Sequence, residues 1–406
     1  RVSERLGRTM RARVPLDAPY ALRLVQSLSR VIASSPLTPS SLNPLVEAMR
    51  PLKHAILTQS LSRLHEVIND HDLAASAHSS RFVEVLTTRI EEELRQLEWD
   101  NGMHAEATKN LGKCFDIVTA KIESALKLDS SSLLLGERVS SIQHTNYRLL
   151  HISHSLCSHW PVEAYSLLRL HRESTSLLTC SVMESIDAIL GTMHGEKMGE
   201  RREGSLYIQE LVSYLSRLSL HSSHSPSSLG QSDIVATVTD RTLLAFLVHS
   251  SLIRPMDEEA VRVQLRKDLD DLLISLDALA IPVGLPCYAK RGEDTILNGL
   301  FNKRINESSS SSISCSFIPS WLQVHFLIAE SPSDLMSPHD SVQYSKEEYV
   351  KWILSQDDPE RLFILSGLLD AYTATVVHKG GTSYVSNYPL IVNLIEESRK
   401  RIGSKA

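Results

Sequence analysis

The sequence predicts an all-α fold, built as an elongated array of antiparallel helical bundles. The first observation is the spacing of apolar residues, which recur three or four positions apart over long stretches, as on one face of an amphipathic helix. The second is the low aromatic content of 5% within a chain that is 42% hydrophobic. Strands are enriched in aromatic and β-branched residues, so a leucine-rich chain with few aromatics favours helical packing.

The first clear helix is predicted at residues 51–71. Its apolar residues recur at a 4-3-4 spacing and form one stripe, made of Leu57, Leu61, Leu64 and Ile68. A second helix is predicted at 81–99, with the acidic residues 91–93 on its outer face. Both segments are therefore expected to lie with one side against a core.

The longest predicted helix covers residues 161–191, which contain no proline or glycine between the first and last positions. Farther along, residues 261–279 predict an amphipathic helix whose inner positions are Val263, Leu269, Leu272 and Leu276. We expect its three aspartates to lie on a solvated face beside basic neighbours. These are Asp268, Asp270 and Asp271.

Helix boundaries near the end of the chain carry chemical signals. Asp358 is predicted to cap a helix at 361–377, with Pro359 at its first position. The last helix is expected to begin near Pro389 and to finish with basic residues and Gly403. Basic residues stabilise the negative end of a helix and glycine ends it, so we expect this to be the end of the protein.

Two helical domains are predicted, covering residues 1–195 and 205–406. Linkers are expected at about 195–204, 221–232 and 306–316, where the sequence is charged or rich in serine. Only 234–238 and 313–318 have a strand-like composition, and each is too isolated to form a sheet.

Composition and charge argue against several classes of protein. The formal net charge is -6, and no basic stripe with interleaved aromatic residues is present, so we expect no nucleic-acid partner. No apolar run approaches the ~20 residues of a membrane-spanning helix. The cysteines form no C-x-x-C pair, a usage typical of a reducing compartment. They are Cys114, Cys157, Cys180, Cys287 and Cys315.

Metal and catalytic motifs are weak. His151, His154, Cys157 and His159 include two histidines at i/i+3 spacing, but they match no zinc pattern and are better interpreted as semi-buried helix positions. His221 and His224 are expected in a solvated linker. The pair Gly380–Gly381 lacks the lysine of a phosphate-binding loop, and no G-x-S-x-G is present. We therefore predict no enzyme activity, no metal and no cofactor.

From about residue 180 onward the chain resembles the subunit-five family of the conserved oligomeric Golgi complex. The resemblance rests on blocks in the family's order: MESIDAI at 183–189, FLVHSSLIRP at 246–255, LDAY at 369–372 and YPLIVNL at 388–394. The match spans a little over half of the chain. The family-motif residues, expected to serve structure or partner contact, are His249, Leu252, Ile253, Arg254, Pro255, Trp352, Tyr372, Tyr388 and Pro389.

The resemblance implies a non-enzymatic, rod-like subunit of a vesicle-tethering complex that scaffolds retrograde transport within the Golgi. It implies a peripheral position on the cytosolic face of the Golgi membrane and assembly with sister subunits, foremost subunit seven. SNAREs, Rab GTPases and coat proteins are further partners that it implies. At the sharpest block, Pro255 is expected to end a helix while the donors of Arg254 bind nearby carbonyls or a carboxylate. A plain turn between helices explains that block equally well.

Three alternatives remain open on the sequence. A subunit of another helical tether, such as the exocyst, would show the same helical character. A helical metal-dependent enzyme would need acids and histidines converging on one pocket. A membrane-surface protein would use the basic residues 399–405, although helix-dipole stabilisation explains these charges more simply.

Overall fold

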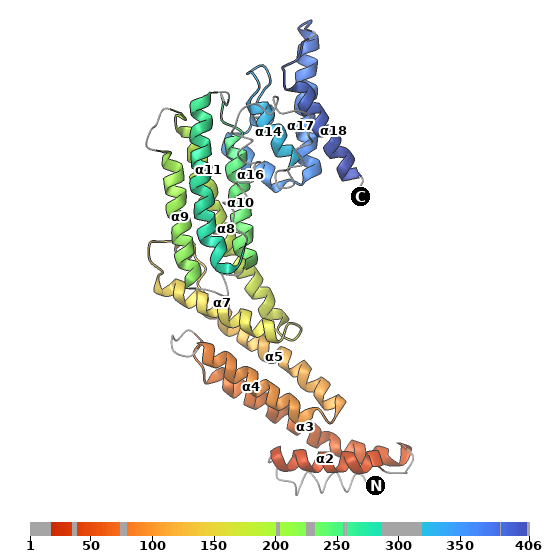
Figure 1. Ribbon diagram of the computed structural model, residues 1–406. Coiled ribbons are helices and arrows are strands. Elements are labelled where there is room, and N and C mark those ends of the chain that lie inside the picture. The colour runs from red at the N-terminus through yellow and green to blue at the C-terminus, as the bar shows by residue number, and fades with distance from the viewer. Residues whose placement is uncertain are drawn as a thin grey trace. The chain divides into compact units, whose positions relative to one another are not determined.

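A computed structural model describes the chain at residues 18–34, 39–73, 79–199, 204–224, 232–254, 256, 258–285, 319–381 and 383–403. These residues form helices, turns and loops and contain no strand, so the predicted all-α fold is confirmed (Figure 1). The packing divides into two compact units, and the division falls inside one helix, between Ser176 and Leu177. The predicted domain limits at 195 and 205 stay a prediction, since a packing unit is not the same as an independently folding domain.

Unit 1 comprises residues 1–132 and 140–176. Its helices are α2 (Ala18–Ser34), α3 (Pro39–Asn69), α4 (Ser79–Leu97), α5 (Asn101–Ala125), most of α6 (Ser130–Leu133), α7 (Ser141–His159) and the first part of α8 (Tyr165–Gly191). The predicted stripe at 51–71 lies in α3, and the helix predicted at 161–191 begins four residues later, at Tyr165. Helix α3 is longer than α8, contrary to the prediction.

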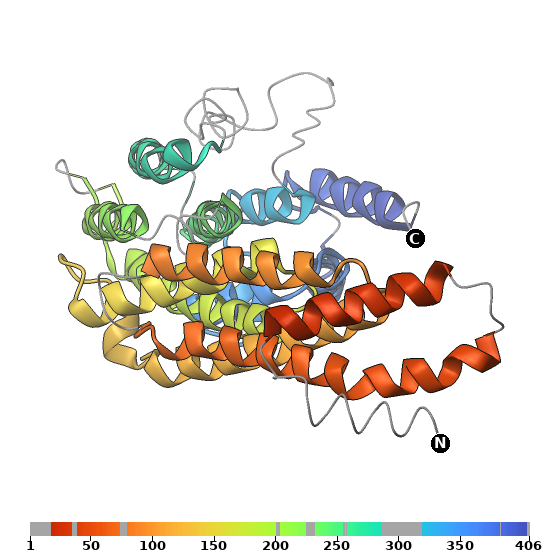
Figure 2. The same ribbon diagram turned by 90° about the horizontal axis from the view of Figure 1, so that it is seen from below.

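Two apolar cores follow one another along unit 1. The first lies where α2 packs on the first half of α3 (Figure 2), and it is closed by the end of α4 and the start of α5. The second gathers the later half of α3 with α4, α5, α7 and the start of α8. Its fully buried members include Ile68, Phe82, Ile90, Phe115 and Ile152. The regular stripe spacing therefore gives each helix one face in a core.

Local capping explains where several helices begin. The Asp100 side chain accepts hydrogen bonds from the backbone of Gly102 and Met103 at the start of α5. Ser140 and Gln143 form a reciprocal capping box at the start of α7. These side chains satisfy backbone donors that have no partner within the helix.

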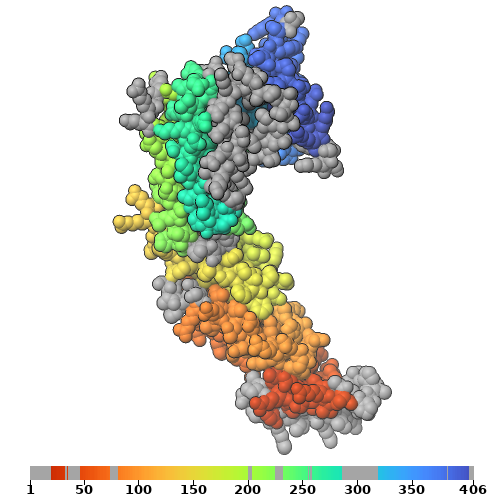
Figure 3. All heavy atoms as spheres, viewed as in Figure 1, coloured from red at the N-terminus to blue at the C-terminus, as the bar shows by residue number. Residues whose placement is uncertain are grey.

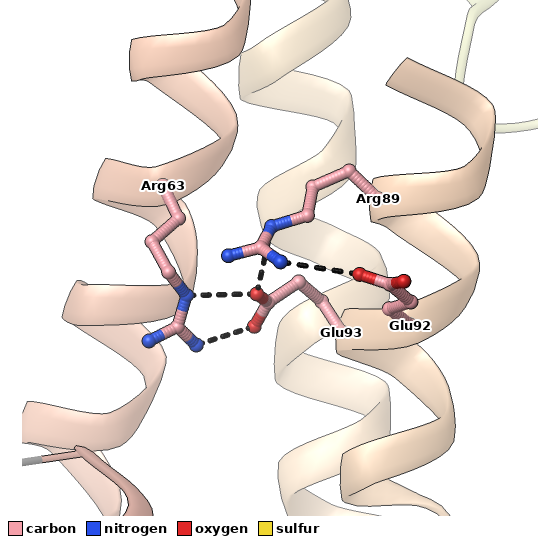
Figure 4. Close-up of polar contacts among 4 residues, drawn as sticks. All are labelled: Arg63, Arg89, Glu92 and Glu93. Atoms are coloured by element: carbon pink, nitrogen blue, oxygen red, sulfur yellow. Dashed lines mark hydrogen bonds and ion pairs between the residues drawn. The ribbon is translucent and has the colours of Figure 1, made fainter. Parts of the chain in front are cut away.

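Glu93 corrects the prediction that residues 91–93 face outward. Its side chain is buried in unit 1 and is held by two hydrogen bonds from Arg63 on α3, at 2.8 and 2.6 Å (Figure 4). Arg89 approaches the same carboxylate at 3.4 Å and also binds Glu92 at 3.1 Å. Burial of this acid is possible because an arginine of the neighbouring helix compensates its charge.

Unit 2 comprises residues 133–139 and 177–406. After α8 it contains η1 (Thr192–Gly195), α9 (Leu206–Ser223), α10 (Ser232–Ser250), α11 (Glu259–Ala280), η2 (Ile281–Val283), α14 (Ser320–Ala329), α15 (Pro338–Ser341), α16 (Lys346–Ser355), α17 (Asp358–His378) and α18 (Tyr388–Gly403). Figure 2 looks along α9, α10 and α11, and Figure 3 shows α9 beside α11 on one face of the unit. One apolar core joins all the longer helices of this unit.

Several predictions for unit 2 need correction. His221 is not solvated but lies buried in the last turn of α9, where its Nε2 contacts the carbonyl of Gly136 at 3.1 Å. In α11 the predicted inner residues Leu269, Leu272 and Leu276 are buried, but Val263 is 58% exposed and Asp268, predicted on the solvated face, is fully buried. The cap of α17 is Asp357, one residue earlier than predicted, because its carboxylate accepts from the backbone of Glu360.

The remaining predicted strands and linkers either form helix or lie outside the described residues. The strand-like residues 234–238 belong to α10, because helical neighbours and a shared core override their β propensity. The predicted linker at 306–316, the second strand-like segment and most of the linker at 221–232 fall outside the described residues. Within the part of the chain that the structure describes, no helix combines the length and the apolar character needed to cross a membrane.

Candidate functional site

The end of α10 places the sharpest sequence block, 246–255, inside unit 2. His249, Leu252 and Ile253 are buried there. The guanidinium of Arg254 donates to the carbonyl of Ile328, at the end of α14, at 2.7 Å and to that of Leu335 at 2.8 Å. Burial lowers the pKa of Arg254, and nearby Asp340 opposes that shift. Pro255 falls outside the described residues.

This arrangement makes Arg254 a clamp between α10 and the turn that follows α14. A planar fork with several donors can satisfy two carbonyls at once, and positive charge is favoured at the negative end of a helix. The contacts lie within the unit, so they support the structural interpretation of this motif residue.

Replacing Arg254 with lysine is expected to destabilise unit 2 by about 1.5 kcal/mol, because an ammonium group is unable to serve both carbonyls in the same geometry. Thermal unfolding of the purified protein measures the change. Arg399→Lys, at an exposed position on α18, is the matched control and is expected to change nothing measurable. Equal stability of the Arg254→Lys variant and the wild type would show that the two carbonyl contacts of Arg254 do not contribute to the stability of unit 2.

A histidine pair, with His249 buried and His194 half-buried, joins α10 to η1. His249 Nδ1 and His194 Nε2 are 2.9 Å apart, so one ring donates the hydrogen bond and the other accepts it. Burial lowers the pKa of His249 to about 3 and that of His194 to about 4. The neighbouring His194 further lowers the pKa of His249, and Lys346 and His339 further lower that of His194. Both imidazoles are therefore neutral at physiological pH.

Trp352 belongs to an aromatic group on α16. It meets Tyr344 edge-on, with ring centroids 5.5 Å apart, and Tyr349 at 6.0 Å. The hydroxyl of Tyr349 contacts Nε2 of the fully buried His325 at 3.2 Å. Tyr349 thus links α16 to α14, while Trp352 packs against Tyr344 and Tyr349 and is itself half-buried.

Tyr372 and Tyr388 meet where α17 packs on α18. Their ring centroids are 5.9 Å apart, and Tyr384 stacks on Tyr388 at 4.4 Å. Tyr388 shares a hydrogen bond of 2.8 Å with Thr373. Pro389 differs from the other described motif residues because it is exposed. The structure therefore forms a cluster at the end of α10, where most of the motif residues are buried. It forms another between α17 and α18, where Tyr372 is buried and Tyr388 is half-buried.

Sequence reasoning missed a polar network around Asp268. The carboxylate accepts hydrogen bonds from Ser205 and, at 2.7 Å, from the hydroxyl of Tyr207. Gln264 donates to Ser205 at 2.7 Å and accepts from the backbone of Gly199. Burial raises the pKa of Asp268 despite these donors. The network joins the start of α9 to α11, and no spacing in the sequence indicated it.

The predicted weak metal motif is dispersed by the fold. Cys157 is buried near the carbonyl of Ala164, and burial raises its thiol pKa to about 11, which disfavours the thiolate that metals bind. His159 Nδ1 contacts the carbonyl of Ser155 on its own helix at 2.7 Å. Among the described residues, no three histidine, cysteine, aspartate or glutamate side chains are grouped to hold a metal ion.

The pair Gly380–Gly381 ends α17. Gly380 has a φ of 70°, and the two glycine amides donate to the carbonyls of Val377 and Val376, the paired bonds of a Schellman cap. Glycine is needed here because other residues rarely adopt positive φ. The pair is therefore a helix stop.

These features define a class of protein: an all-α array of packed bundles whose buried polar groups bind other parts of the same fold. Comparisons with known proteins then narrow the class. The chain is 23% identical over 386 residues to conserved oligomeric Golgi complex subunit 5 of Mus musculus, covering 87% of this chain and 46% of that protein. It is 21% identical to the subunit 5 of Arabidopsis thaliana, covering 86% and 46%, and 20% identical to that of Drosophila melanogaster, covering 88% and 51%.

These three relatives, each matched over nearly nine tenths of this chain, support a relationship to the family of conserved oligomeric Golgi complex subunit 5. The three matches extend the similarity well beyond the part after residue 180 in which the motif blocks lie. The chain spans about half the length of the curated relatives it matches. No protein-family model matches it, and no solved structure does.

Proposed function

We propose that the protein is a non-enzymatic subunit of the Golgi vesicle-tethering complex and scaffolds retrograde vesicle transport within the Golgi. The observation that carries the proposal is the similarity to three relatives of one named family over nearly nine tenths of the chain. The fold supports it, because packed helical bundles hold surfaces apart and present them to partners without a catalytic pocket.

The proposed partners are the other subunits of the conserved oligomeric Golgi complex, subunit 7 foremost, together with SNAREs, Rab GTPases and coat proteins. The proposed location is peripheral, on the cytosolic face of the Golgi membrane. For the motif residues we propose a mainly structural role, which is supported by the burial of His249, Leu252 and Ile253 and by the carbonyl contacts of Arg254. Pro389 is exposed and is proposed as a partner contact.

The proposal is tested by affinity purification of the tagged full-length protein from its own cells, with mass spectrometry of the chains that co-purify. We expect the other subunits of the Golgi complex in amounts comparable to the bait, and fluorescence imaging is expected to place the protein at the Golgi. Recovery of exocyst subunits in their place, or of no stoichiometric partner, would contradict the proposal. An untagged strain serves as the control.

A further inference from the structure

Helix α17 is apolar on two opposite faces, but only one of them is covered. Its inner face packs against α14, α15 and α18 in unit 2 through Leu362, Leu365, Leu368, Leu369 and Tyr372. A helix at a protein surface normally carries polar residues on its outer side, and a helix that is apolar all round is normally buried.

The outer face of α17 is defined here by Phe363, Gly367, Ala371, Ala374 and Val377. Phe363 is 70% exposed and Val377 is 63% exposed, and the three small residues between them are exposed as well. These positions follow a 4-4-3-3 spacing and therefore lie along one side of the helix. The face is a shallow apolar strip with a large side chain at each end.

One carboxylate interrupts this strip. Asp370 is exposed and lies seven residues from both Phe363 and Val377, so it lies on the same side of the helix, in the middle of the strip. It forms no hydrogen bond or ion pair with any residue that the structure describes. A helix that covered the strip would remove water from this carboxylate, which is costly unless the incoming helix brings a positive charge.

The position of Asp370 argues against a second copy of the chain as the occupant. In a two-fold symmetric pair, α17 would cross itself in antiparallel fashion at the middle of the strip. The two Asp370 carboxylates would then meet beside the symmetry axis, and like charges in contact are destabilising. Charge therefore favours a different chain with a basic residue at this point.

We propose that the outer face of α17 docks an amphipathic helix of another subunit of the tether. That helix carries a lysine or arginine opposite Asp370 and large apolar side chains over Gly367 and Ala371. Small residues on one helix allow the backbone of a second to approach closely, which improves packing along the whole contact. This inference rests on the proposed function, since it takes its partner from the same complex.

The test uses the full-length protein co-expressed with the other subunits of the complex, each identified by mass spectrometry after purification. Ala371→Trp blocks the strip and Asp370→Lys reverses its charge. The matched controls place the same residues on exposed helical positions elsewhere, with Ala105→Trp on α5 and Asp270→Lys on α11. All four positions are exposed, so thermal unfolding is expected to match the wild type.

We expect both α17 variants to reduce the recovery of one particular subunit about tenfold, while the controls leave every subunit at the wild-type level. A photoreactive phenylalanine analogue in place of Phe363 is expected to crosslink to a helix of that subunit that contains a lysine or arginine within one turn of the crosslink.

Three outcomes would overturn the inference. Wild-type recovery of all subunits by Ala371→Trp and Asp370→Lys would reject the docking face and leave the proposed function standing. Crosslinking at position 363 to a second copy of this chain would reject the choice of occupant. Failure of the wild-type protein to recover any other subunit would reject the proposed function and the docking face together.

Discussion

Replacing Arg63 with methionine is expected to destabilise unit 1 by about 4 kcal/mol, among the largest effects of any single substitution in this unit. Glu93 would remain in a site where its side chain is only 4% exposed, with Arg89 at 3.4 Å as its remaining partner. A buried carboxylate that loses its two shortest hydrogen bonds is costly, because the single longer contact with Arg89 does not replace the water that the side chain gives up on folding. Urea unfolding, followed by hydrogen exchange of the α3 and α4 amides, measures the loss.

Two further variants make this prediction specific. Arg63→Met combined with Glu93→Leu is expected to regain most of the lost stability, because both charges leave together and Arg89 keeps Glu92. Arg50→Met breaks an ion pair with Glu47 in which both side chains are largely exposed, and it is expected to cost below about 0.5 kcal/mol. Similar losses of unfolding free energy for Arg63→Met and Arg50→Met would contradict the view that burial of Glu93 makes its ion pair important.

Acidification from pH 7.5 to pH 5 is expected to destabilise unit 2 through its buried histidines. Burial lowers the pKa of His325 to about 3, that of His249 to about 3 and that of His194 to about 4. In the unfolded chain a histidine has a pKa near 6.5, so between that value and the folded pKa the unfolded state binds more protons. Stability therefore falls as the pH falls through this window, by about 2 kcal/mol at pH 5 for His325 alone.

The share of His325 is isolated by a double variant, His325→Leu with Tyr349→Phe. The variant removes both partners of the 3.2 Å contact and leaves no unpaired hydroxyl behind. Its unfolding free energy is expected to fall less steeply than that of the wild type between pH 7.5 and pH 5, by about 2 kcal/mol. The comparison also cancels the opposing effect of Asp268, Asp187 and Glu330, whose pKa values burial raises.

A control for the loss of a histidine side chain is His378→Gln at the exposed end of α17, which is expected to leave the unfolding free energy at pH 7.5 unchanged. Identical slopes for the wild type and the His325 double variant would show that the His325 ring does not stay neutral in the folded protein. Fluorescence-detected urea unfolding at five pH values supplies both slopes.

Two helices were predicted at the right place, but some of their residues were assigned to the wrong face. The helix predicted at 81–99 matches α4, yet Glu93 was assigned to the solvent face because it lies outside the apolar stripe of Val83, Leu86, Ile90, Leu94 and Leu97. In α11 the same reasoning failed in both directions, with Asp268 buried and Val263 exposed. In both helices the helical period of the apolar residues was correct. The error lay in how much of the helix surface the neighbouring helices cover.

Predictions made from side-chain chemistry were correct where they concerned the type of partner that a side chain binds. The donors of Arg254 suggested carbonyl partners from the sequence, and the structure supplies the carbonyls of Ile328 and Leu335. Its partners lie 74 and 81 residues farther along the chain, and no local signal identified them. The network of Asp268 with Ser205 and Tyr207 had no signal at all, because serine and tyrosine are common and their pairing spans about 60 residues.

The sequence by itself determined the helical class and the position of most helices, and it carried the motif blocks that resemble the family, because periodicity, caps and ordered motif blocks are local properties of the chain. Only the tertiary structure decided which polar groups are buried and which apolar face is left open. Burial of Glu93 depends on Arg63 from another helix, and exposure of Phe363 depends on where α14, α15 and α18 pack. The burial of Glu93 and the exposure of Phe363 are both set by contacts between segments far apart in the chain. A periodic pattern predicts an apolar face but does not identify the segment that covers this face.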